Sequence, residues 1–185
     1  MANANMQDRV VGAGSPAQGV KAAPVITLLT NVEKLVLDQT GATAVVTVQP
    51  TGNFATLGTQ DTIKFVVRAS FRTLTGGTST SVVSIYKGNT VVSGNKVASI
   101  TSQSLVTLPA SGWLEAHLVW DSVSLVLSGY QAGGYGTTLL IPAALTNTAI
   151  AVANQQALQF CISATNGSSV TGTTFTLGEF VIDNG

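Results

Sequence analysis

Strict alternation of apolar and polar side chains over residues 62–72 is the feature that most restricts how this chain can fold. The segment reads TIKFVVRASFR, and its apolar positions include Ile63, Phe65, Val67, Ala69 and Phe71. A period of two residues puts successive side chains on opposite faces of a β-strand. One face of this strand therefore packs on a core, and the other, mostly polar, faces away from it.

Similar short runs, separated by turn residues, continue to the C-terminus. Lys87-Gly88-Asn89 and Asn166-Gly167 predict hairpin turns, and the glycines of residues 133–136 predict a flexible turn. The one helix candidate, residues 148–158, is explained equally by an extended segment or a single turn. We predict strands over residues 25–30, 32–37, 43–49, 62–72, 81–86, 90–99, 113–120, 123–128, 157–164 and 173–182.

This pattern predicts an all-β fold, an antiparallel jelly-roll-like sandwich of about 8–10 strands. In the last strand, alternation puts Phe175 and Leu177 on one face and Phe180 and Ile182 on the other. The predicted core consists of Ile63, Phe65, Val67, Phe71, Leu114, Leu118, Trp120, Leu158, Phe160, Ile162, Phe175 and Leu177.

Residues 1–24 show neither strand nor helix periodicity. They also lack the basic start and apolar stretch of a secretory signal, so export by that route is not indicated. We predict an extended N-terminal arm over residues 1–24 and a single sandwich domain over residues 25–185; a frayed terminus is the alternative for the arm. The residues expected to attach the arm to a neighbouring protein are Arg9, Val10, Val11 and Lys21.

The charge balance favours association. Charged residues make up 9% of the 185 residues, and the net charge is zero, a combination that promotes contact between molecules. All eight basic residues share residues 1–100 with four acids, whereas residues 101–185 hold four acids and no Lys or Arg. Two explanations stay open: the halves dock head to tail, or the segregation arises by chance. Without a basic cluster, nucleic-acid binding is not expected. The longest apolar run, Leu139–Leu145, is too short to span a membrane.

Candidate catalytic residues are few. His117 is the only histidine, and Asp121 lies about 13 Å further along an extended strand, too far for a hydrogen bond. Glu115 and Asp121 are the nearest pair of acids that glycoside hydrolysis would need. Cys161 lies in an apolar run and is expected to be an unreactive thiol. We therefore expect no catalytic residues, no metal site and no cofactor.

Four aromatic residues, Trp113, Trp120, Tyr130 and Tyr135, fall close together in the sequence. Trp120 shares the apolar face of residues 113–120, and Trp113 shares the polar face with Glu115 and His117. Exposed aromatic side chains form either an oligomer seam or a platform that stacks on sugars. The predicted seam consists of Trp113, Tyr130 and Tyr135.

The order of segments in the C-terminal part of the chain resembles the trimeric jelly-roll capsid decoration, or cement, proteins of tailed bacteriophages. The resemblance is carried by WLEAHLVW at 113–120, SGYQAGGYG at 128–136 and AVANQQALQFCISATNGSSVTGTTFTLGEFVID at 151–183. It implies a non-enzymatic homotrimer, made in the host cytoplasm, that binds the major capsid protein on the outside of the virion and stabilises neighbouring capsomers. A receptor-binding or carbohydrate-binding module of a tail fibre or tail tip uses the same architecture and is the alternative.

Overall fold

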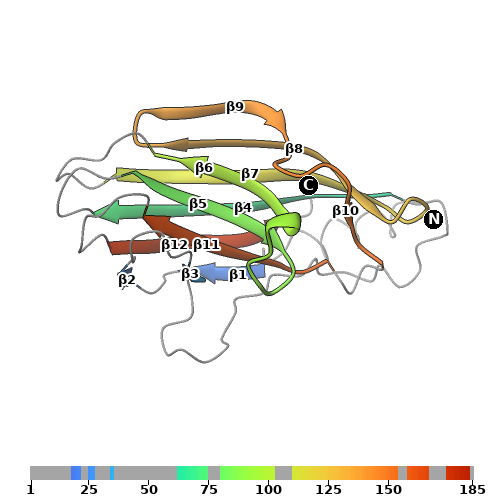
Figure 1. The fold of residues 1–185 in the computed structure, drawn as a ribbon, viewed down its shortest axis with the longest axis horizontal. Coiled ribbons are helices and arrows are strands. Elements are labelled where there is room, and N and C mark those ends of the chain that lie inside the picture. The colour runs from blue at the N-terminus through green and yellow to red at the C-terminus, as the bar shows by residue number, and fades with distance from the viewer. Residues whose placement is uncertain are drawn as a thin grey trace, which may run out of the picture.

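The structure is a computed structural model that describes residues 18–21, 25–27, 34–35, 62–74, 80–102, 110–153, 158–166 and 174–183. Most of these residues form antiparallel β-strands, and the strands make two sheets that pack face to face (Figure 1). The predicted all-β, antiparallel, jelly-roll-like sandwich is therefore confirmed. No helix in the described part of the chain is long and apolar enough to cross a membrane.

The large sheet has eight strands, with β4 and β7 at its centre. Its order is β1-β12-β4-β7-β8-β10; β2 also pairs with β12, and β9 also pairs with β8. Its strands are β1 (Gln18–Lys21), β2 (Val25–Thr27), β4 (Thr62–Leu74), β7 (Ala110–Asp121), β8 (Val126–Tyr135), β9 (Thr138–Ala144), β10 (Ile150–Ala151) and β12 (Thr174–Asp183).

The small sheet has four strands in the order β3-β11-β5-β6. Its strands are β3 (Lys34–Leu35), β5 (Ser81–Lys87), β6 (Lys96–Thr101) and β11 (Phe160–Asn166). Strands β5 and β6 pair as the hairpin predicted around Lys87-Gly88-Asn89. A 3-10 turn over Ser93–Asn95 lies in their connection, so the strand predicted over residues 90–99 begins only at Lys96.

The core between the sheets contains the predicted residues. The Phe65 ring of β4 lies 5.8 Å from the Phe160 ring of β11, so this pair joins the two sheets. Phe71 contacts Tyr135 edge to face at 5.0 Å and stacks on Phe175 at 5.5 Å. Every predicted core residue is buried, except that the side chain of Ile63 lies outside the described ones.

A β-bulge corrects the prediction for the last strand. The register of β12 against β4 shifts between Leu177 and Glu179. The extra residue, Gly178, reverses the alternation, since a bulge opposes two residues to one on the partner strand. Phe180 and Ile182 therefore point into the same core as Phe175 and Leu177, instead of to the opposite face.

Two other expectations about connections are wrong. Strands β11 and β12 belong to different sheets, so they do not pair as the hairpin predicted around Asn166-Gly167. Gly133 and Gly134 lie inside β8, and the turn comes after Tyr135. Within residues 148–158, the described part contains the short strand β10 and no helix.

The predicted arm overlaps the sheet at one place. Residues 18–21 form β1, which pairs with β12 of the same chain from Gln18↔Ile182 to Lys21↔Glu179. The rest of residues 1–24, including Arg9, Val10 and Val11, lies outside the described residues. The main chain at Lys21 therefore belongs to the sheet of its own molecule.

Candidate functional site

The outer face of the large sheet, on the side away from the core, holds the candidate functional residues. In β7, Leu114, Ala116, Leu118 and Trp120 are buried in the core, and the positions between them point outward. Trp113, Glu115 and His117 therefore share one outer row. The adjacent strands β4 and β8 bring Arg68 and Tyr130 beside this row.

His117 is held by two neighbours on this face. Its Nε2 lies 2.9 Å from Oε2 of Glu115, two residues earlier in β7. Its ring stacks on Tyr130, its register partner in β8, with ring centroids 4.5 Å apart and an angle of 7° between the planes. Sequence reasoning missed both contacts. Residues two apart in a strand share a face, so the contact between His117 and Glu115 could have been predicted. The stack with Tyr130 could not, because it depends on the β7–β8 register.

Trp113 lies across β8 instead of standing away from the sheet. A Cβ atom at Gly134, its register partner, would lie 2.7 Å from the indole Nε1. The glycine therefore leaves the space that the indole occupies. Trp113 still exposes 41% of its surface, so it is an accessible aromatic side chain with a restricted position.

Strand β9 extends this face with aliphatic side chains. Gly134 of β8 pairs with Trp113 of β7 on one side and with Leu139 of β9 on the other. Leu139 therefore lies in the same cross-strand row as Trp113. Leu139 and Ile141 are 69% and 72% exposed, the highest values among the large apolar side chains described. Trp113, Tyr130, Leu139 and Ile141 are thus exposed on three adjacent strands, and we call these four residues the β7–β9 patch.

Gln131 fixes β9 in place. Its amide nitrogen Nε2 donates a hydrogen bond to the carbonyl of Ala144 at 2.8 Å, and its Oε1 accepts one from the backbone N–H of Ser99 in β6 at 2.9 Å. Gln131 lies where the β8–β9 register shifts. One buried side chain thus ties the edge of the small sheet to the outermost strand of the large sheet.

Charged side chains occupy the other half of the outer face. Arg68 of β4 forms an ion pair with Glu179 of β12 at 3.8 Å, and its register partner in β7 is Glu115. Strand β4 lies between two acidic strands, so charges from the basic and acidic halves of the sequence meet inside one molecule. Charges that are paired within one molecule are not available for head-to-tail docking between two molecules.

Tyr135 must be removed from the predicted seam. Its side chain is fully buried against Phe71, and its hydroxyl donates a hydrogen bond to Oγ1 of Thr73 at 2.9 Å. Burial raises the pKa of the Tyr135 phenol, and the hydrogen bond with Thr73 offsets part of that rise. The inward parity of Tyr135 follows from Gly133 and Gly134 being strand residues, which the sequence pattern did not indicate.

The two acids considered for hydrolysis have separate roles. Asp121 accepts hydrogen bonds from the backbone N–H of Val123 at 2.8 Å and from the Ser124 hydroxyl at 2.9 Å. These bonds lower the pKa of Asp121. Glu115 lies six residues earlier, roughly 20 Å along the strand. The pair is therefore too far apart for the two-carboxylate arrangement of glycoside hydrolases.

Other chemistry-bearing groups are dispersed in the described residues. No group of three or more His, Cys, Asp or Glu side chains gathers there in a way that could hold a metal ion. The Cys161 thiol is buried and lies 3.8 Å from the carbonyl oxygen of Thr90. Its buried position agrees with the expectation of an unreactive thiol.

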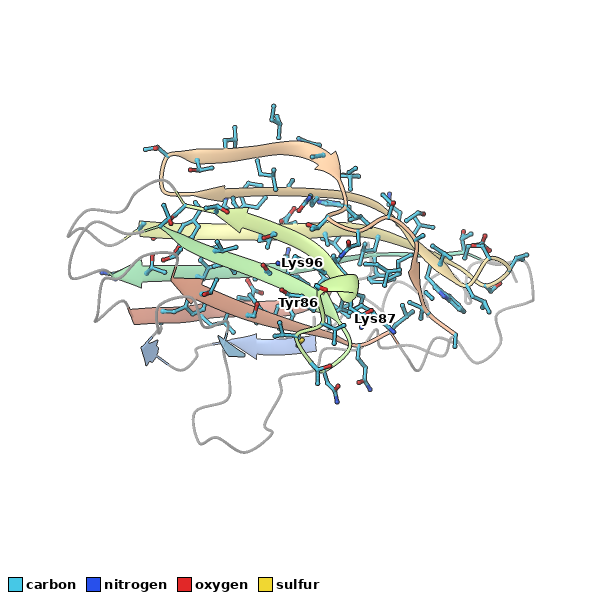
Figure 2. All side chains as sticks on the ribbon, in the orientation of Figure 1. Tyr86, Lys87 and Lys96 are labelled. Atoms are coloured by element: carbon cyan, nitrogen blue, oxygen red, sulfur yellow. The ribbon has the colours of Figure 1, made fainter. Side chains whose placement is uncertain are left out.

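The outer face of the small sheet offers less free surface. Ser84, Tyr86, Cys161 and Ser163 have outward parity in β5 and β11, yet all four are buried. Figure 2 shows Lys96 beside Tyr86 near the end of the β5–β6 hairpin, and the Lys96 ammonium lies 5.3 Å from the centroid of the Tyr86 ring. The accessible apolar surface described here is therefore concentrated on the opposite side, over β7–β9.

Comparison with known proteins gives no family. No family model and no curated protein matches the chain. Among solved structures, it is similar to the carbohydrate recognition domain of Emp46p in its potassium-bound form, with a TM-score of 0.34 and 10% identity over 66% of this chain and 72% of the other. It is also similar to metal-free lectin I-B4 from Griffonia simplicifolia, with a TM-score of 0.34 and 12% identity over 90% of each chain. These scores are too low to carry an argument about function.

Proposed function

We propose that the protein is a non-enzymatic structural component of a virion, a capsid decoration protein that bridges and stabilises neighbouring capsomers. The observation that carries the proposal is the β7–β9 patch. Trp113, Tyr130, Leu139 and Ile141 leave apolar surface exposed on a chain with 9% charged residues and no net charge. Such a surface suits a molecule that functions while covered by partners.

The polar groups of the outer face support a structural role. Glu115 contacts His117, the His117 ring is covered on one side by Tyr130, and Arg68 pairs with Glu179. Each contact fixes a side chain on the sheet. The Ser124 hydroxyl donates a hydrogen bond to the Asp121 carboxylate in the exposed β7–β8 turn, where the bond fixes the turn.

The proposed assembly follows the sequence resemblance. The protein forms a homotrimer, binds the major capsid protein on the outer surface of the virion, and is made in the host cytoplasm. Residues 1–24 contribute to attachment, with Arg9, Val10, Val11 and Lys21 as contacts; Lys21 is the last residue of β1. Closed symmetry would cover the exposed patch without unlimited growth of the assembly.

Electron microscopy of purified virus particles tests the proposed location. We expect density for a β-sandwich at repeated positions on the outside of the capsid shell, absent from particles of a mutant that lacks the protein. Density confined to the tail would contradict the decoration role and favour the second candidate.

The second candidate is a glycan-binding module of a tail fibre or tail tip. Trp113 and Tyr130 present aromatic surface beside the polar groups of Glu115 and His117, and sugar rings bind to aromatic faces flanked by hydrogen-bonding groups. A glycan array provides the test. Binding that is abolished by Trp113→Ala and retained by Val123→Ala, a change at an exposed turn residue, would support this candidate over the first.

A further inference from the structure

The β7–β9 patch has the composition of a protein interface core. It combines two aromatic side chains, Trp113 and Tyr130, with two highly exposed aliphatic ones, Leu139 and Ile141. Residues 101–185 contain no Lys or Arg, so strands β7, β8 and β9 bring no cation to this surface. Interface cores are enriched in aromatic residues and depleted in charged residues, Lys above all.

The aliphatic half of the patch indicates a protein partner. Leu139 and Ile141 have no polar atoms in their side chains to meet the hydroxyl groups of a sugar. In Figure 2, side chains of β9 project away from the sheet at the outer limit of the molecule. Covering these side chains would release more ordered water than covering either aromatic ring alone.

Strand β9 also carries a feature that directs how a partner approaches. Among the described residues, β9 pairs only with β8, so its other edge is open. Pro142 lies within β9, and a proline has no N–H to donate to an added strand. The register shift beside Gln131 further interrupts the edge. These features disfavour edge-to-edge strand addition and leave packing through the exposed side chains.

A second copy of the same chain meets the electrostatic requirements. Two copies with zero net charge do not repel each other. The acid nearest the patch, Glu115, already contacts His117, so apposing two patches does not place two unpaired carboxylates together. On the small sheet, Ser84, Tyr86, Cys161 and Ser163 are buried despite their outward parity, and the two most exposed large apolar side chains of the described part, Leu139 and Ile141, lie on β9.

We propose that the β7–β9 patch is the interface between copies of this chain, centred on Leu139 and Ile141 with Trp113 and Tyr130 beside them. The proposal rests on the homo-oligomer in the proposed function. It keeps Trp113 and Tyr130 of the predicted seam and adds strand β9, which the sequence did not indicate. It needs no capsid contact and holds whether the assembly serves as a decoration protein or as a tail module.

Sedimentation velocity over a range of protein concentrations tests the interface. We expect the wild type to be oligomeric at micromolar concentration, and Leu139→Ser and Ile141→Ser each to raise the dissociation constant about tenfold or more. Val123→Ser is the matched control, because Val123 is 64% exposed but lies in the β7–β8 turn. Circular dichroism confirms that each variant is folded. A monomeric wild type, or Ser variants that associate like the control, would overturn the proposal.

Thiol labelling gives an independent readout. In a Cys161→Ser background, Ile141→Cys and Val123→Cys each supply one exposed thiol. We expect maleimide labelling of the cysteine at 141 to slow as protein concentration rises, and labelling at 123 to stay constant. Equal, concentration-independent rates would contradict the interface. A wild-type protein that is oligomeric through this patch but does not bind capsids would count against the decoration role alone.

Discussion

At the scale of single residues, Gly129 determines how closely β8 can approach β7. Its φ is +144°, and a Cβ atom there would lie 1.9 Å from the backbone carbonyl oxygen of His117. No side chain can occupy that space without separating the two strands that carry His117 and Tyr130. Gly134, in contrast, faces the side chain of Trp113, which has room to move outward.

We expect Gly129→Ala to lower the free energy of unfolding by about 2–4 kcal/mol, since it combines backbone strain with a steric clash. Gly94→Ala is the matched control, because nothing lies within 4 Å of a Cβ atom at Gly94. Urea unfolding followed by circular dichroism measures both. Equal stability of the two variants would show that the close approach of β8 to β7 is not as the structure has it.

Tyr135 connects burial to pH dependence. Its folded-state pKa is raised above the ordinary value of 10.0, so the neutral phenol is favoured in the fold. That stability is present below pH 10 and is lost as the pH rises through the folded-state pKa. Tyr135→Phe has no group to ionise. At pH 7 we expect it to be less stable by about 0.5–1.5 kcal/mol, for the lost hydrogen bond.

The stability difference between wild type and Tyr135→Phe should therefore shrink as the pH rises above 10. Urea unfolding at pH 7, 9, 10 and 11 measures it. A difference that stays constant across this range would mean that the phenol ionises as easily in the folded as in the unfolded protein, which contradicts its burial.

At the scale of elements, the β7–β8 turn depends on Asp121. Its carboxylate accepts bonds from Val123 and Ser124, which hold its pKa below the ordinary value of 3.8. A carboxyl with a depressed folded-state pKa stabilises the fold above its unfolded pKa and loses this effect as the pH falls. We expect wild type to be more stable than Asp121→Ala at pH 6, with the difference declining below pH 4.

Acid titration followed by circular dichroism measures this difference, with Asp121→Asn as control because its amide oxygen still accepts the Val123 hydrogen bond. A wild-type advantage over Asp121→Ala that persists unchanged to pH 2 would contradict the role given to the carboxylate.

Strand β9 depends on Gln131 for its attachment to β6. Gln131→Leu leaves the N–H of Ser99 and the carbonyl of Ala144 without this partner, and we expect a loss of about 1–3 kcal/mol. Ser128→Ala, an exposed change on the same strand, is the control. Hydrogen exchange should show faster exchange of the Ser99 amide in Gln131→Leu alone. Unchanged protection of the Ser99 amide would contradict the hydrogen bond between Ser99 and Gln131.

The elements also show what alternation can predict. Strands β4 and β7 were predictable because one face is buried and the other is not, so each inward side chain is marked by its parity. Strand β8 was not, because Gly129, Gly133 and Gly134 carry no side chain that marks a face. In β12, the bulge at Gly178 reverses which residues point into the core. In addition, the pattern of apolar residues does not indicate which of the two sheets a strand joins.

The candidate site, like the fold, was predictable only where parity within one strand determines a position. The outward position of Trp113 followed from parity within one strand, whereas its place over Gly134 and the stack of His117 on Tyr130 depend on strand register. The exposure of Leu139 and Ile141 was hidden because an apolar run such as LLIPAAL is typical of a buried strand. Their exposure follows from the edge position of β9, which only the tertiary fold establishes.

At the scale of the whole molecule, the two outer faces of the sandwich differ. The outward residues Ser84, Tyr86, Cys161 and Ser163 of the small sheet are buried, whereas β7–β9 of the large sheet expose apolar side chains. The predicted arm ends at β1, which adds to the large sheet at the edge opposite β9 (Figure 1). Lys21 of β1, the described residue among the proposed capsid contacts, therefore lies at a different edge of the sheet from the proposed copy-to-copy surface. A decoration protein needs this separation, because it must bind its own copies and the capsid at the same time.

The most direct test adds purified protein to capsids that lack it and measures the temperature at which they release their contents. We expect full-length protein to bind and to raise this temperature. A variant lacking residues 1–16, which keeps β1 intact, should remain oligomeric but bind more weakly. Capsids that rupture at the same temperature with and without bound protein would contradict the central claim.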